Sequence, residues 1–157
     1  MHLLLHARII GLPVPQGRPR AFKVPTGQIR MYDPKTSRTW KTDIKNQVLA
    51  MPDRKPPSSA PLAMRLRFFL PRPKTLPKRV HLHTKKPDCD NLGKAVKDSI
   101  GKGVTYYDDS QIVALVIVKE YSAEPGVEIE VWELPQAPAR ICAEQPTLFT
   151  DLLSLEA

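Results

Sequence analysis

The alternation of apolar and polar positions predicts four β-strands in this chain. Residues 3–12 form the first predicted strand. Residues 64–70 place apolar side chains at every second position, with arginines between them, which is typical of a strand with one exposed face. Residues 112–118 are almost wholly apolar, which favours a central strand, and residues 127–131 alternate again. The loop near Pro125 predicts a hairpin between these last two strands.

Two other segments repeat their apolar residues with the period of an α-helix. The first runs from about residue 37 to residue 50. The second begins at Asp90 or Asn91 and ends at Gly101, a residue type that is common where helices stop. The buried stripe of this second helix is predicted to comprise Leu92, Ala95, Val96, Ser99 and Ile100. Together these elements predict an α+β domain, a small mixed or antiparallel sheet with the two main helices on one face.

The chain also changes character along its length. Its 157 residues suit one domain with a single core. After Leu134 the tail holds one base against three acids. We therefore expect a folded domain over residues 1–134 and a flexible tail over residues 135–157.

The basic charge of the chain is concentrated near its N-terminus. The formal net charge is +8, and residues 1–45 hold nine Lys or Arg against two acids. Such an excess indicates an acidic partner, most often nucleic acid, with a membrane surface or simple solubility as alternatives. A long loop over residues 16–30 carries Arg18, Arg20 and Lys23. Lys41 lies on a basic side of the first predicted helix, where phosphate contact and an ordinary solvated surface are equally good interpretations.

The compartment is indicated by features that the chain lacks. Cys89 and Cys142 do not make a disulfide framework or a cysteine metal site. No window approaches eighteen uninterrupted apolar residues, and the start has no signal-peptide layout. We expect a cytoplasmic protein without a membrane partner.

Acidic residues gather in one part of this basic chain, and they predict a metal site. Residues two apart in extended chain point to the same side, so Asp88 and Asp90 are able to face one ion. Lys94 follows Asp90 by four residues and is its neighbour on a helix, about 5 to 6 Å away at Cβ. Asp109 comes after the helix. Carboxylates that hold Mg²⁺ become a phosphate site, because the ion reverses the local charge.

Each of these residues also has an ordinary structural interpretation. Asp90 is a good helix N-cap, Asp109 suits a turn, and Lys94 suits a surface ion pair. Taken together and in this order, they favour catalysis over these separate roles. Asp98 and Asp108 are interpreted as a solvated helix residue and a turn residue, with Asp108 close enough to support the metal ligands.

The order and spacing of these residues resemble the RusA-like Holliday junction resolvases over about residues 85–121. The resemblance rests on Asp88, Asp90 and Asn91, then Lys94, and then the pair Asp108–Asp109 followed by Ser110, Gln111 and Ile112. It is weaker over the first fifty residues and absent beyond Leu134.

The resemblance implies a Mg²⁺-dependent endodeoxyribonuclease in which Mn²⁺ is a possible substitute. Asp88, Asp90 and Asp109 would be metal ligands and Lys94 the catalytic lysine. It further implies a homodimer in a bacterial or phage-infected cell that resolves four-way DNA junctions by paired symmetric nicks. The DNA contacts expected are Arg18, Arg20, Lys23, Lys41, Lys85 and Lys86. A metal nuclease for other branched DNA and a non-catalytic recombination accessory protein remain as alternatives.

The tail contains a second short motif. Residues 145–149, Gln-Pro-Thr-Leu-Phe, resemble the Gln-x-x-Leu-Phe peptides by which bacterial replication and repair proteins dock on the sliding clamp. A short amphipathic helix that packs on this protein or on its dimer mate is an equally good interpretation.

Overall fold

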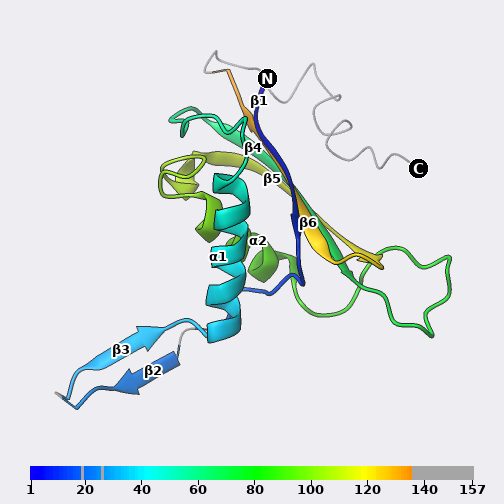
Figure 1. Cartoon of the computed structure of the whole chain (residues 1–157), viewed down its shortest axis with the longest axis horizontal. Coiled ribbons are helices and arrows are strands. Elements are labelled where there is room, and N and C mark those ends of the chain that lie inside the picture. The colour runs from blue at the N-terminus through cyan, green and yellow to red at the C-terminus, as the bar shows by residue number, and fades with distance from the viewer. Residues whose placement is uncertain (19, 26, 136–157) are drawn as a thin grey trace.

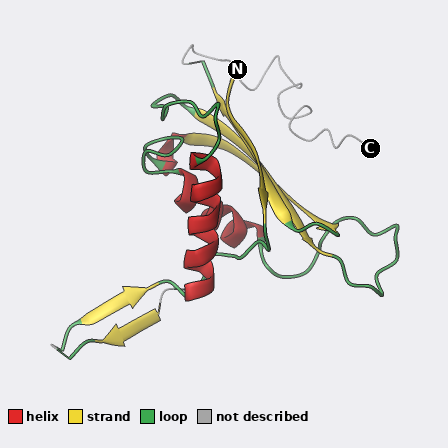
Figure 2. Cartoon of the chain, viewed as in Figure 1, coloured by secondary structure: helices red, strands yellow, loops and turns green. Residues whose placement is uncertain are grey.

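The computed structural model describes residues 1–135 except residues 19 and 26. Two small layers make up the fold, a four-stranded sheet and a pair of helices on one of its faces (Figures 1 and 2). The strands of the sheet are β1 (His2–Ile10), β4 (Leu62–Pro71), β5 (Ile112–Ser122) and β6 (Gly126–Glu133). The helices are α1 (Lys35–Leu49) and α2 (Cys89–Ile100), and a 3₁₀ turn, η1 (Asp109–Gln111), precedes β5. The predicted α+β class is therefore confirmed.

The order of strands in the sheet is β1-β6-β4-β5, which corrects two expectations. β5 is an edge strand rather than a central one, and it runs parallel to β4 because α2 makes the crossover between them. β6 does not form a hairpin with β5. It inserts between β1 and β4 and is antiparallel to both. The apolar run in β5 reflects its contacts with α2 on one face, whereas Val113 and Leu115 remain exposed.

The core lies between the sheet and the two helices. In β4 every second side chain from Met64 to Leu70 is buried, as the alternating pattern predicts. Both helices direct their apolar stripes toward the sheet and pack on each other. The fully buried positions include Ile44, Val48, Met64, Leu66, Phe68, Leu92, Val96, Ile100 and Ile129. Within the described residues, no helix is long and apolar enough to cross a membrane.

Among the described residues, no helix covers the opposite face of the sheet, and the charged side chains of this face pair across the strands. Arg67 of β4 donates to Glu120 of β5 at 2.7 Å. Arg65 of β4 donates to Glu130 of β6 at 2.8 Å. The guanidinium of Arg8 lies 3.7 Å from the centre of the Phe69 ring. These cross-strand pairs explain how the face remains stable in water.

The segment expected to be one long loop contains a second, small sheet. β2 (Arg20–Lys23) and β3 (Ile29–Tyr32) form an antiparallel hairpin that projects from the domain beside α1 (Figure 1). The prolines and glycines of the segment obscured this pattern, since they argue against strands wherever they occur. Asp33 holds the base of the hairpin to α1, because it accepts hydrogen bonds from Lys41 at 2.6 Å and Gln16 at 3.1 Å.

Gly126 tests the pairing of β1 with β6. A Cβ at this position would overlap the carbonyl oxygen of Ile9, so Gly126→Ala has to displace the strand. We expect the variant to lose about 3 kcal/mol of unfolding free energy in denaturant titrations. Gly27→Ala is the control, because Gly27 has a φ of +85° and no neighbour within 4 Å. Gly27→Ala therefore has no steric overlap and carries only the cost of a left-handed backbone, about 1 kcal/mol. Equal losses in the two variants would contradict the close approach of the strands.

Candidate metal centre

The N-terminus of α2 presents two carboxylates that have no hydrogen-bond or ion-pair partner within the described residues. Asp88 occupies the N-cap position in an extended conformation, and its side chain makes no capping hydrogen bond. Asp90 lies in the first turn, and both side chains are exposed. An aspartate at this position ordinarily accepts a backbone N–H of the helix. The capping interpretation therefore fails for Asp90, which is inside the helix, and Asp88 holds its carboxylate free for another ligand.

Lys94 lies one turn beyond Asp90 on the exposed side of α2. Within the described part of the chain, its ammonium group makes no hydrogen bond or ion pair with protein. This placement agrees with the i to i+4 spacing expected from the sequence. The helix thus carries two acids and a base near its N-terminus, where its dipole also favours negative charge.

The loop that leads into α2 is held by β5. The Lys119 ammonium donates to the carbonyl oxygens of Lys85 at 2.8 Å and of Pro87 at 2.7 Å. The backbone of the same lysine accepts a hydrogen bond from His83 at 2.9 Å. Burial and the nearby Lys119 charge lower the pKa of His83, which favours its neutral form. Lys119 therefore fixes the chain immediately before Asp88.

A surface hollow of about 520 Å³ opens beside Asp88. Its apolar wall comes from leucines and prolines of three separate segments, and Gln16, Lys86, Asp88 and Asn91 supply its polar groups. The amide of Gln16 donates to the carbonyl oxygen of Asn91 at 2.8 Å, which ties the base of the β2–β3 hairpin to the first turn of α2. Segments distant in the sequence thus meet at this end of the helix.

The second acidic pair lies on a rigid turn. The Asp108 carboxylate accepts from the amide of Ser110 at 2.8 Å and completes a capping box with Gln111. The Ser110 hydrogen bond lowers the pKa of Asp108. The Gln111 side chain accepts from the amides of Tyr107 and Asp108 and donates to the carbonyl oxygens of Ser58 and Ala60. Asp108 is thus a structural turn residue, as expected, and Gln111 attaches the turn to the segment that leads into β4.

Asp109 contacts the opposite end of α2 from Asp88. The hydroxyl of Tyr106 donates to Asp109 Oδ1 at 3.3 Å and to the carbonyl oxygen of Lys97 at 3.1 Å. Burial is the main cause that raises the pKa of Tyr106 far above its ordinary value, and the nearby Asp109 carboxylate raises it further. The hydroxyl therefore keeps its proton and remains a donor. Asp109 Oδ1 also lies 3.3 Å from the place that a Cβ on Gly101 would occupy. The described geometry therefore places this carboxylate beside the C-terminus of α2.

The length of α2 keeps the expected ligands apart within one chain. A rise of about 1.5 Å per residue places Asp88 and Gly101 about 20 Å apart along the axis. Allowing for the reach of both side chains, the carboxylates of Asp88 and Asp109 are at least about 11 Å apart. Two oxygens on one Mg²⁺ lie only about 4 Å apart. One chain therefore places Asp88, Asp90 and Lys94 at the N-cap and in the first two turns of α2, and it holds Asp109 beside the other end of the helix. Because α2 begins at Cys89, Asp90 is helical, which corrects the expectation that Asp88 and Asp90 share one side of an extended segment.

One trio of possible ligands does converge within the described residues. The ligand atoms of His6, Glu128 and Glu130 all lie within 4.8 Å of one another on the open face of the sheet. His6 lies 3.1 Å from Glu128, and Arg65 already pairs with Glu130. This trio is part of the cross-strand charge network, and it is far in the sequence from the expected site.

The expected DNA contacts differ in exposure and in their ion pairs within the described residues. Arg18, Lys23, Lys85 and Lys86 are exposed, and nothing is described for the side chain of Arg20. Lys41 differs, because its ammonium lies 2.6 Å from Asp33 and 3.5 Å from Asp98. Lys41 has a structural role in this arrangement, and Asp98 is an ion-pair partner rather than a solvated residue.

Sequence reasoning gave no positioning role to three residues that hold the site in place: Tyr106, Gln111 and Lys119. Each acts through hydrogen bonds to groups distant in the chain, and a sequence pattern does not report such contacts. Gln111 had one available signal, since it stands three residues after Asp108 where a capping box requires Glu or Gln.

Comparison with known proteins identifies the family of the chain. A family model described as endodeoxyribonuclease RusA matches residues 11–132, and this family uses a divalent metal. The uncharacterized protein YqaN of Bacillus subtilis (strain 168) is 34% identical over 138 residues, covering 80% of this chain and 94% of that protein. The chain belongs to the RusA family.

The Tyr106 hydroxyl should make the free energy of unfolding depend on pH in the alkaline range. The folded state raises the pKa of Tyr106 above the ordinary 10.0, whereas the unfolded chain releases this proton near pH 10. The unfolding free energy should therefore fall above pH 10, by up to about 1.4 kcal/mol per pH unit from this group. Tyr106→Phe should show a shallower decline in denaturant titrations from pH 9 to 11. Identical slopes would show that the hydroxyl ionises equally in both states.

Proposed function

We propose that this protein is a Mg²⁺-dependent nuclease that resolves four-way DNA junctions by paired symmetric nicks. The observation that carries the proposal is the placement of Asp88, Asp90 and Lys94 near the N-terminus of α2, where none of them has an ion pair with the part of the chain that the structure describes. Membership of the RusA family supplies the reaction class. The proposed division of the chain is a nuclease domain over residues 1–134 and a separate tail.

The donor set fits a hard cation. Carboxylate oxygens are the ligands that Mg²⁺ prefers, and Mn²⁺ accepts the same set. Such an ion, when bound, activates water and neutralises phosphate charge. Asp88 and Asp90 are the ligands that one chain supplies. Lys94 projects from the same side of the helix, where its ammonium stabilises negative charge that develops on the phosphate.

A second copy of the chain completes the ligand set in this proposal. Asp109 is too far from Asp88 to share an ion within one chain, yet it is exposed on a rigid turn. In a two-fold dimer, Asp109 of each chain reaches the Asp88–Asp90 pair of the other, so two equivalent sites result. Two such sites suit symmetric nicks in two strands.

Two alternatives make different predictions. A nuclease for other branched DNA would cut flaps or forks in preference to four-way junctions. An accessory protein would bind junctions without cutting them. The Gln145–Phe149 motif lies outside the described residues, and docking on a sliding clamp through this motif stays a proposal that a clamp pull-down with Leu148→Ala and Phe149→Ala would test.

Cleavage of a labelled synthetic four-way junction tests the proposed function. Wild type with Mg²⁺ should produce paired symmetric nicks, and EDTA should abolish them. Lys94→Ala should cut on the order of 10²- to 10³-fold more slowly, judged from the loss of one preorganised charge contact. Asp90→Asn should be inactive. Both variants should bind the junction within a few-fold of wild type. Tight binding by a wild type that never cuts would instead support the accessory protein.

Mixing two inactive variants tests the shared site. Asp90→Asn and Asp109→Asn are each expected to be inactive as homodimers. In a heterodimer, one composite site would combine the intact Asp88–Asp90 pair of one chain with the intact Asp109 of the other. Co-expression should therefore restore nicking, with about one active site per heterodimer. If each site were instead built from a single chain, every site in the heterodimer would contain either Asp90→Asn or Asp109→Asn, and the mixture would stay inactive.

A further inference from the structure

The excess of positive over negative charge lies in two projections of the protein. The basic hairpin (residues 18–32) holds four Lys or Arg, and the basic arm (residues 72–86) holds six. Neither segment contains an acid. Together they carry ten of the 24 bases and none of the 16 acids, so the remaining chain has 14 bases against 16 acids. The net charge of +8 therefore resides entirely in these projections.

The basic arm has a defined shape. Arg72 folds back on it, because its guanidinium donates to the carbonyl oxygens of Pro77 and Val80. Turns close from Pro73 to Leu76 and from Pro77 to Val80. Where the arm returns to the sheet, the backbone amide of Tyr121 in β5 donates to the carbonyl oxygen of His81 at 2.8 Å. The Arg72 bonds and the two turns brace residues 72–80, and the Tyr121 bond attaches the returning chain to the edge strand β5.

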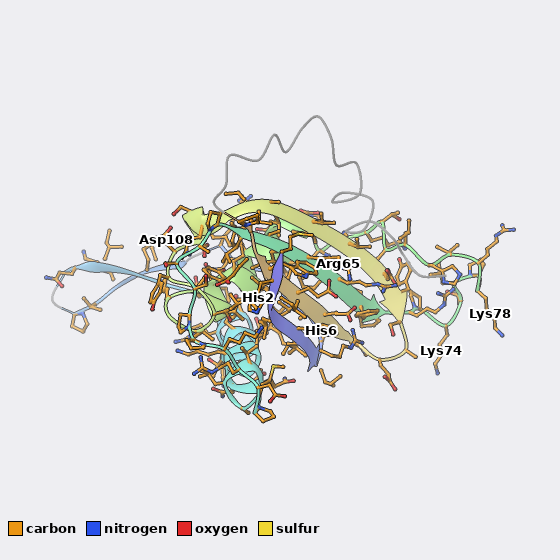
Figure 3. All side chains as sticks on the ribbon, turned by 90° about the horizontal axis from the view of Figure 1, so that it is seen from above. His2, His6, Arg65, Lys74, Lys78 and Asp108 are labelled. Atoms are coloured by element: carbon orange, nitrogen blue, oxygen red, sulfur yellow. The ribbon has the colours of Figure 1, made fainter. Side chains whose placement is uncertain are left out.

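The cations on the basic arm are unpaired within the described part of the chain. Lys74, Lys78 and Arg79 are exposed, and none of them makes an ion pair there. Figure 3 shows Lys74 and Lys78 pointing away from the domain. Bases elsewhere are commonly neutralised, as Lys41 is by Asp33 and Arg67 by Glu120. Unpaired cations on a braced loop suit a polyanion, whose counterions they displace.

Both projections are joined to the domain beside the candidate metal centre, and they extend in opposite directions. The chain entering the hairpin is tied to α2 through Gln16 and Asn91, and the arm ends at Lys86, next to Asp88. Gln16 and Lys86 line the same hollow. Figures 1 and 3 place the hairpin and the arm at opposite ends of the molecule. A DNA branch point at the hollow would direct different duplex arms along the two projections.

We propose that the basic hairpin and the basic arm bind different duplex arms of one branched DNA, and that their simultaneous engagement gives the protein its preference for branched DNA. This inference rests on the proposed function and names the surface that reads the substrate. A linear duplex bound at one projection leaves the other empty. A junction engages both, so loss of either projection should remove the preference.

Competition between a four-way junction and a linear duplex tests the inference. The arm variant is Lys74→Gln/Lys78→Gln, and the hairpin variant is Arg18→Gln/Lys23→Gln. The control variant, Lys35→Gln/Lys45→Gln, removes the same charge from exposed positions of α1. Fluorescence anisotropy over a range of salt concentrations with Ca²⁺ measures binding without cleavage, and circular dichroism checks that each variant is folded.

The expected result is a loss of junction preference. The arm variant should bind the junction on the order of tenfold more weakly, while its duplex affinity falls much less. The slope of log affinity against log salt should decrease by about 1.8 per protomer for the junction, at about 0.9 per lost phosphate contact. The hairpin variant should show the same loss as the arm variant. A variant that combines both sets of substitutions should have a junction preference only slightly lower than either one. The control variant should lower the affinities for the junction and for the duplex slightly and by the same factor.

Other outcomes separate the two proposals. An arm variant that matches the control, or that weakens junction and duplex in equal proportion, would overturn the two-arm inference and leave the nuclease proposal standing. A wild type that binds neither DNA would overturn the proposed function itself. A wild type that binds duplex and junction equally, yet cuts junctions, would show that branch selection occurs after binding and would overturn the inference.

Discussion

The rigidity of α2 is the constraint on which the site depends. Its 12 residues separate the Asp88 and Asp90 carboxylates from Asp109, and each end is fastened separately. Lys119 holds the chain before Asp88, whereas Tyr106 holds Asp109 against the last turn. A helix of this length does not shorten to bring its two ends to one ion. The separation of the acids is therefore a property of the fold, and it makes a second chain the natural source of the missing ligand.

The sequence predicted those parts of the fold that depend on local periodicity. Both helices and the alternating strand β4 follow from apolar spacing, and the stripe from Leu92 to Ile100 is buried as expected. The order of strands was not predictable in this way. An apolar run such as β5 reads equally as a central strand or as an edge strand that packs on a crossover helix. The β2–β3 hairpin was missed because its flanking prolines and glycines conceal short strands.

The same division applies to the site. The spacing of Asp88, Asp90 and Lys94 over the N-cap and the first two turns of α2 is a local property, and the sequence therefore indicated it. The distance from Asp88 to Asp109 depends on how the chain returns after α2, which no spacing rule reports. Charge also has a local and a global part. Composition shows an excess of bases, but only the structure shows that Lys41 is paired while Lys74 and Lys78 are exposed at the end of a braced arm.

A crystal structure of the protein with Mn²⁺, located by anomalous scattering, would test the shared metal centre most directly. The account predicts an ion bound by Asp88 and Asp90 of one chain and by Asp109 of a second chain, with two such ions related by a two-fold axis. An ion held by all three carboxylates of a single chain would contradict it. So would an ion at His6, Glu128 and Glu130 with none at Asp88.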